Sequence, residues 1–109
     1  MIQVALADEI PVGEARRFTV GDREVAVVNA GGHFYAVDDI CSHEHFHLSD
    51  GEVDVDELTI ECPKHGSQFS LEDGHPRSLP AVLPVPVYGV RVVDGAVFVE
   101  VLQPQEATP

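Results

Sequence analysis

The sequence predicts a single all-β domain, and three observations support this prediction. The chain has 109 residues, a length that suits one domain. Alternating apolar residues and β-branched runs recur along it, while no window has apolar residues at sustained helical spacing. Hydrophobic residues make up 44% of the chain and charged residues 23%, which is the composition of a packed globular protein.

Eight segments have the alternation or β-branched content of strands: residues 2–5, 17–20, 24–29, 33–37, 58–61, 68–71, 88–93 and 96–101. Four of them are expected to form two hairpins, one across Gly31-Gly32 and one across Asp94-Gly95, because such dipeptides favour tight turns between strands. The only helix expected is a turn or so after the first acidic loop. Residues 103–109 are expected to be a flexible tail, which leaves a domain of residues 1–102.

The charge of the chain excludes some classes of partner. Six basic residues against nineteen acidic ones give a net charge of −13, which repels nucleic acids and anionic membrane surfaces. Nine of the acids lie between Asp38 and Glu61, without Lys or Arg. This segment is either a solubilising loop or a docking face for a basic partner. No stretch suits a transmembrane helix and the first ten residues lack the features of a secretory signal, so we expect a cytoplasmic protein.

Both cysteines of the chain have a histidine at metal-ligand spacing. Cys41 and His43 form a Cys-x-His pair, and Cys62 and His65 form a Cys-x-x-His pair. Two such loops can supply the four ligands of a tetrahedral zinc ion or of a two-iron cluster. Isolated cysteines are more often small buried apolar groups, and a disulfide is not expected in a reducing compartment. The two paired histidines favour the metal interpretation.

The remaining histidines suggest a rival site. Imidazoles alternate along residues 43–47, and such a pattern could hold a single metal ion in a cupin-like barrel. That interpretation leaves the second Cys-x-x-His pair unexplained, and the chain is short for such a barrel. His45 and His47 are therefore expected to be surface loop histidines. His33 and His75 have no second ligand nearby and are expected not to bind metal.

Together these motifs resemble the Rieske [2Fe–2S] family. The resemblance is carried by the following elements of residues 38–81: Cys41-x-His43, Leu48-Ser49-Asp50-Gly51, Glu61-Cys62-Pro63-x-His65-Gly66, Phe69, Asp73-Gly74 and Leu79-Pro80-Ala81. In size the chain is similar to the small ferredoxins that serve bacterial multicomponent oxygenases. The resemblance implies three stacked antiparallel sheets, with both ligand loops at the tip of a small cluster-binding subdomain.

The resemblance also implies roles for individual residues. One [2Fe–2S] cluster per chain would be held by Cys41 and Cys62 on the buried iron and by His43 and His65 on the outer iron. Neutral imidazoles in place of two thiolates make such a cluster easier to reduce than one held by four cysteines. Gly66 would let the backbone pass close to the cluster.

Several other positions are informative by the same resemblance. Pro80-Ala81 would form a loop that shields the cluster from water. Phe46 and Lys64 occupy the positions at which Rieske proteins of respiratory and photosynthetic complexes have a second, disulfide-bonded pair of cysteines. Ser67 stands where those proteins have a serine that donates to a cluster sulfur, and in this chain it either donates likewise or faces solvent.

The sequence therefore predicts an electron carrier and not an enzyme. It has no nucleophile elbow, no phosphate-binding glycine loop and no carboxylate pair spaced for acid–base catalysis. The resemblance implies a monomeric carrier that takes one electron from a flavin-dependent reductase to a terminal oxygenase, often an aromatic-ring dioxygenase, through basic faces on those partners. The alternatives are a small Rieske-type subunit of a nitrite reductase or cluster-assembly system, and a zinc-stabilised binding module.

Overall fold

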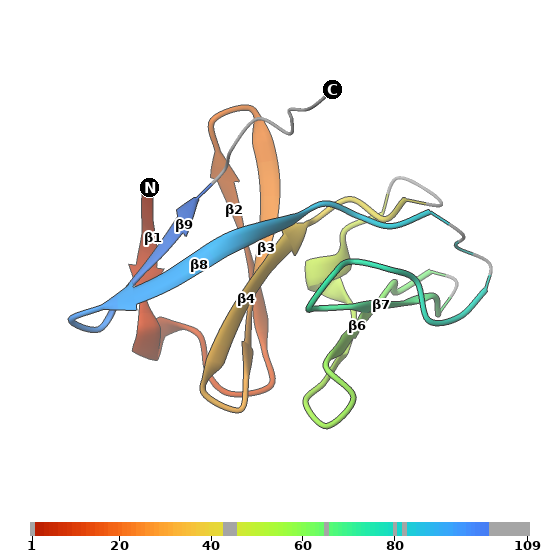
Figure 1. Cartoon of the computed structure of the whole chain (residues 1–109), viewed down its shortest axis with the longest axis horizontal. Helices are drawn as coiled ribbons and strands as arrows, with labels where there is room; N and C mark the ends of the chain where they lie inside the picture. Colours follow the sequence, from red (N-terminus) through yellow and green to blue (C-terminus); the bar gives the residue numbers. More distant parts are fainter. Residues whose placement is uncertain (1, 43–45, 65, 80, 82, 101–109) are drawn as a thin grey trace.

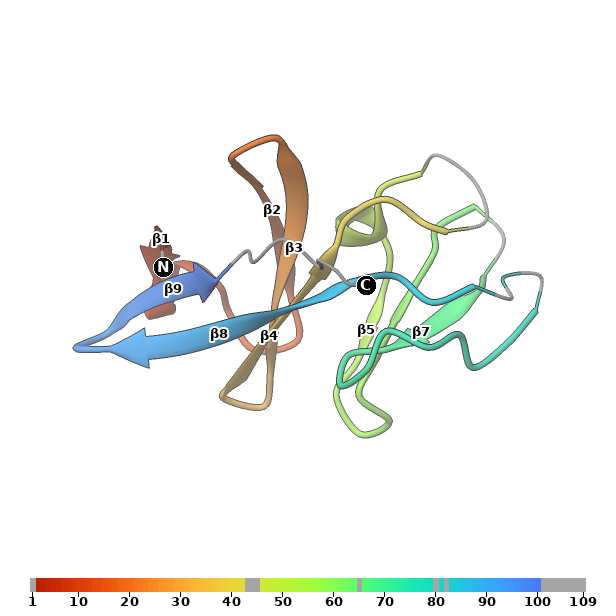
Figure 2. The same cartoon turned by 45° about the horizontal axis from the view of Figure 1, so that its top comes forward.

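The computed structural model describes residues 2–42, 46–64, 66–79, 81 and 83–100, which form antiparallel strands and short turns (Figures 1 and 2). The strands of this part are β1 (Ile2–Leu6), β2 (Ala15–Val20), β3 (Arg23–Ala30), β4 (His33–Asp38), β5 (Val53–Asp54), β6 (Thr59–Glu61), β7 (Gln68–Ser70), β8 (Val87–Val93) and β9 (Ala96–Glu100). Two short 3-10 helices, η1 (Ala7–Glu9) and η2 (Leu48–Asp50), complete it. The all-β prediction is confirmed.

The strands are arranged as three layers, but they form two hydrogen-bonded sheets. The order is β1-β9-β8-β4-β3-β2 in the large sheet and β5-β6-β7 in the small one. Figure 1 shows β1 and β9 on one side of β2, β3 and β4, and the small sheet on the other side. The three separate sheets that we expected are corrected to two because β8 pairs with β4, through Tyr88 opposite Ala36 and Val87 opposite Val37.

Strand β3 forms the centre of the molecule because both of its faces are buried. Side chains alternate between the faces of a strand. Val25 and Val27 pack into a core with residues of β1 and β9. Ala26 and Val28 pack into a second core, which contains Leu48 of η2 and residues of the small sheet, with both cysteines. The small sheet is therefore held against the large one by apolar burial on β3 and on Val37 of the neighbouring strand β4.

The hairpins predicted from turn dipeptides are present. Strands β3 and β4 meet across Gly31-Gly32, and β8 and β9 meet across Asp94-Gly95, where both residues of the turn have positive φ, 52° and 78°. The helical turn η2 lies within the acidic segment. Strand β5 and η1 were not predicted, since two or three residues carry too little pattern. No helix in the described ranges is long and apolar enough to cross a membrane.

Candidate metal centre

The second ligand loop connects two strands of the small sheet. Strand β6 ends one residue before Cys62, and β7 begins after Ser67. The loop is closed by the backbone N–H of Cys62, which donates to the Ser67 carbonyl at 2.7 Å, and by the N–H of Gly66, which donates to the Cys62 carbonyl at 3.0 Å. Gly66 has φ of +77°, so glycine is required here by the left-handed backbone. His65, between these closures in the sequence, lies outside the described residues.

The first ligand loop follows β4 and is closed in a similar way. Ile40 and His47 form an isolated antiparallel bridge, and the N–H of Cys41 donates to the Phe46 carbonyl at 2.9 Å. His43 and His45 lie outside the described residues. The structure therefore describes the two cysteines of the expected ligand set and the closures of both loops.

Both cysteine side chains are buried at the end of the molecule where these loops meet. Cys41 is 4% exposed and Cys62 is fully buried, and both belong to the core that contains Ile60 and Phe69. They are not joined by a disulfide. Two thiols in one apolar cluster, each within a closed loop, fit a shared metal or cluster better than they fit two unrelated core residues.

A third loop, at residues 78–83, contacts both ligand loops. The hydroxyl of Ser67 accepts the N–H of the buried Ala81 at 3.1 Å, and the hydroxyl of Ser42 donates to the Leu83 carbonyl. The hydroxyl of Ser78 accepts the N–H of Gln68 at 3.0 Å. Ala81 is buried and Pro80 lies outside the described residues, so the shielding of the site by residues 80–81 stays a prediction. The solvent-facing alternative for Ser67 is wrong, because this side chain is completely buried.

Phe46 and Lys64, which stand where some Rieske proteins have disulfide-bonded cysteines, contact each other across the two ligand loops. The Lys64 ammonium lies over the Phe46 ring, with Nζ 5.7 Å from the centroid. A cation–π contact of this kind is worth about 0.5–1 kcal/mol at an exposed site. It therefore links the loops more weakly and more reversibly than a covalent bond would.

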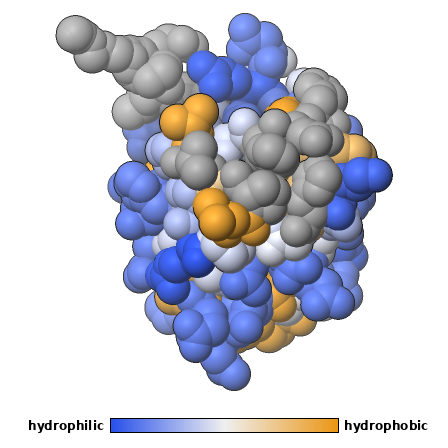
Figure 3. Space-filling model, turned by 90° about the vertical axis from the view of Figure 1, so that its right-hand side faces the viewer, coloured by the Kyte–Doolittle hydropathy of each residue, from blue (hydrophilic) through white to orange (hydrophobic). Residues whose placement is uncertain are grey.

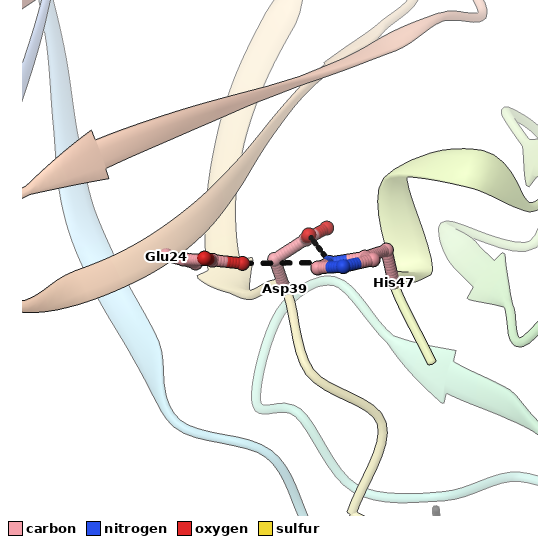
Figure 4. Close-up of side chains that lie close together, drawn as sticks. All are labelled: Glu24, Asp39 and His47. Carbon is pink, nitrogen blue, oxygen red and sulfur yellow. Dashed lines mark hydrogen bonds and ion pairs between the residues drawn. The ribbon is translucent and has the colours of Figure 1, made fainter. Parts of the chain in front are cut away.

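His47, which we expected to be a surface loop histidine, is partly exposed and contacts two carboxylates. Its Nδ1 lies 2.7 Å from Oδ2 of Asp39 and 3.4 Å from Oε1 of Glu24 (Figure 4). Asp39 is fully buried, although its sequence context suggested a solvated acidic segment. Sequence reasoning missed this pair because nothing local distinguishes Asp39 from the exposed acids that follow it.

A half-buried polar cluster lies beside the first loop. The Tyr88 hydroxyl donates to Oδ1 of Asp38 at 2.9 Å, and Arg23 lies 4.0 Å from the same oxygen. Burial raises the pKa of Asp38, and the Tyr88 hydrogen bond and the Arg23 charge offset part of that rise. Burial, together with the Asp38 charge, raises the pKa of Tyr88 to about 12. These groups attach β8 to β4 where the first ligand loop begins.

Some acids of the segment from Asp38 to Glu61 lie away from the ligand loops. Asp54 caps the β5–β6 turn by accepting the N–H groups of Asp56 and Glu57, both at 3.0 Å. This turn and the second ligand loop lie at opposite ends of β6 (Figure 1). Glu61, in contrast, directly precedes Cys62. Only part of the negative charge of this segment therefore lies beside the second ligand loop.

With this geometry established, comparison with known proteins identifies the family. Residues 1–89 match the model of the Rieske [2Fe–2S] domain, so the chain belongs to that family. It is similar to the 3-phenylpropionate/cinnamic acid dioxygenase ferredoxin subunit of Escherichia coli (strain K12), with 38% identity over 97 residues, which cover 89% of this chain and 90% of that protein.

Solved structures give the same result. The ferredoxin of carbazole 1,9a-dioxygenase from Nocardioides aromaticivorans IC177 is 35% identical and superposes with a TM-score of 0.86, covering 92% of this chain and 98% of that one. A chain from the complex of reduced oxygenase and oxidized ferredoxin in carbazole 1,9a-dioxygenase is 38% identical, with a TM-score of 0.84 and coverages of 90% and 99%. The predicted family, fold, [2Fe–2S] cofactor and role as an electron carrier, not an enzyme, are confirmed.

Proposed function

We propose that this chain holds its [2Fe–2S] cluster through Cys41, His43, Cys62 and His65. It would carry single electrons from a flavin-dependent reductase to the terminal oxygenase of a ring-hydroxylating system. The observation that carries the proposal is the convergence of both ligand loops, with two buried cysteines in one apolar cluster. The relatives named for dioxygenase ferredoxin subunits support the oxygenase as acceptor.

In this proposal the cysteine ligands and the histidine ligands have different environments. The cysteine side lies in the core, where burial excludes water from the thiolates. The two imidazoles would leave the first coordination shell less negative than four thiolates, which makes the cluster easier to reduce. The three mutually bonded loops hold these ligands with little reorganisation when an electron arrives.

The same end of the molecule offers a surface for partners. Leu79 and Leu83 are 77% and 62% exposed on either side of the buried Ala81. Figure 3 looks onto this end, where apolar patches interrupt a largely hydrophilic surface. A central apolar contact with a charged rim is the usual anatomy of a protein interface. We propose that reductase and oxygenase dock here, with basic residues on their side facing acids such as Glu61. The monomeric state and the cytoplasmic location stay predictions from the sequence.

The proposal is tested by metal analysis of the purified chain and of ligand variants. We expect about two irons and two sulfides per chain, with one reducible electron. C41S, C62S, H43A and H65A should each lose iron, whereas H33A and H75A, which change exposed histidines, should retain it. One zinc per chain in place of iron would contradict the electron-carrier proposal and support a zinc-stabilised module.

The choice of partner needs a separate measurement. Stopped-flow oxidation of the reduced chain by a ring-hydroxylating oxygenase should be faster than its oxidation by a nitrite reductase catalytic subunit. The reverse order would favour the alternative of a nitrite reductase small subunit. L79S and L83S should slow the reaction with the oxygenase without loss of iron, and V92S, which changes an exposed residue of β8, is the matched control.

A further inference from the structure

A buried carboxylate stands at the start of the first ligand loop. Asp39 follows β4, precedes Cys41 by two residues and has no exposed surface. A buried ionised carboxylate is stable only where hydrogen bonds and opposite charges replace water. Its partners therefore indicate what the side chain holds in place.

Both carboxylate oxygens of Asp39 are bonded to the returning limb of the loop. Oδ1 accepts the backbone N–H of Ser49 at 2.8 Å, and Oδ2 lies 2.7 Å from Nδ1 of His47. An ionised carboxylate only accepts, so a proton on Nδ1 of His47 completes this hydrogen bond. Arg17 of β2 approaches the same oxygen at 3.6 Å. One side chain thus attaches two residues of the loop's end to its beginning.

The backbone of Asp39 makes the same connection. Its carbonyl accepts the N–H of Leu48 at 2.6 Å, and its N–H donates to the Glu24 carbonyl of β3 at 2.9 Å. Leu48 is fully buried beside the cysteines. Asp39 therefore closes the base of the loop that carries Cys41 and His43, and it also attaches this loop to the central strand β3.

The same side chains do not make a convincing metal site. Ligand atoms of Glu24, Asp39 and His47 lie within 4.8 Å of one another (Figure 4). The Arg17 guanidinium contacts Oδ2 of Asp39 and would repel a cation, and Oδ1 is occupied by Ser49. The arrangement is that of a hydrogen-bonded clamp.

We propose that Asp39 and His47 are positioning residues for the first ligand pair, a role that rests on the proposed cluster at Cys41 and His43. Their clamp sets the distance between the two limbs of the loop and thereby fixes the geometry of the histidine ligand relative to Cys41. Loss of the clamp opens the base of the loop, which changes the environment of the outer iron and speeds the loss of the cluster.

The test is made in the full chain. It uses substitutions that change the number of hydrogen-bond donors or acceptors on one side chain. D39N leaves one acceptor oxygen where two donors converge, so an amide NH2 faces either Ser49 or His47. D38N is the matched control, because Tyr88 and Arg23 both contact the single oxygen Oδ1, which an amide retains, and the remaining hydrogen bond of this carboxylate comes from the nearby backbone of Ile40. H47A removes the donor to Asp39, and H47N restores a nitrogen donor near the position of Nδ1.

Three readouts separate positioning from general stability. D39N and H47A should lose iron to a chelator faster by about tenfold or more, as expected for loss of a hydrogen bond to a charged group. Their reduced clusters should have altered electron paramagnetic resonance spectra, and the amides of Leu48 and Ser49 should exchange hydrogen faster. H47N and D38N should remain close to the parent in all three.

The outcomes are distinguishable. Parental spectra and chelation rates in D39N and H47A would overturn the inference, as would a D38N variant equal to D39N, which would indicate a general loss of stability. If D39N does not fold, the comparison of H47A with H47N is sufficient to test the inference. A parent chain that binds no iron would refute the proposed function, and hydrogen exchange at Leu48 and Ser49 would still test the clamp.

Discussion

Replacing Ser67 with alanine tests how the third loop supports the metal centre. The Ser67 hydroxyl is fully buried and accepts the N–H of Ala81, itself 3% exposed. Its removal leaves a buried N–H without an acceptor, which costs about 1–3 kcal/mol. For a domain of this size each kcal/mol lowers Tm by about 4–8 °C. S67A should therefore melt at least several degrees below the parent chain.

The matched control is S70A. Ser70 is also buried, but its hydroxyl accepts the N–H of Glu72 and donates to the carboxylate of Asp73, and both partners belong to exposed residues that can bond to water instead. We expect S70A to cost less than about 1 kcal/mol, the net value of an ordinary hydrogen bond. Thermal unfolding followed by circular dichroism measures both variants. Equal losses in S67A and S70A would refute the reasoning.

The reduction potential of the same two variants tests which group accepts the hydroxyl proton of Ser67. Its oxygen already accepts from Ala81, so its proton is available to another acceptor, and the resemblance to other Rieske proteins suggests a cluster sulfur. A hydrogen bond that stabilises the reduced state by about 1 kcal/mol raises the reduction potential by roughly 40 mV for one electron. S67A should lower the potential by about that amount in voltammetry, and S70A should leave it unchanged. An unchanged potential in S67A would mean that the proton does not go to the cluster.

Three further predictions follow from individual contacts. G74A should be much less stable than G95A in urea unfolding: both glycines have φ of +78°, but a Cβ at Gly74 would lie 2.0 Å from a carbonyl oxygen while Gly95 is open. Because the pKa of Tyr88 rises from 10.0 to about 12 on folding, its contribution to stability is present below pH 10.0 and lost as pH rises through about 12; in Y88F this part of the pH dependence should disappear. E61Q should flatten the salt dependence of electron transfer from the reductase more than E57Q, since only Glu61 adjoins the ligand loop.

Each of these has a contrary result. Equal urea midpoints for the two glycine variants would mean that the loop relaxes away from the added methyl group. The same loss of stability in Y88F and the parent above pH 10.0 would assign the effect to other groups. Equal salt slopes for the two glutamate variants would show that partners sense the net charge of the whole chain instead of the charge at the site.

The sequence by itself determined the features that depend on neighbouring residues. The Cys-x-His and Cys-x-x-His pairs indicated a metal centre because the spacing of ligands within one loop is a local property. The two hairpins could be predicted from Gly31-Gly32 and Asp94-Gly95, since turn type depends on the residues of the turn. Alternation of apolar residues was enough for the all-β class.

Only the tertiary structure decided which distant segments meet. The bond from Ser42 to Leu83 and that from Tyr88 to Asp38 join residues 41 and 50 positions apart, and no local pattern announces such pairs. Asp39 and Asp56 look alike in sequence, yet one is completely buried and the other is exposed. The burial of a carboxylate depends on the donors that surround it in space, here Ser49, His47 and Arg17. The charge and rigidity of the metal centre are therefore properties of the folded chain.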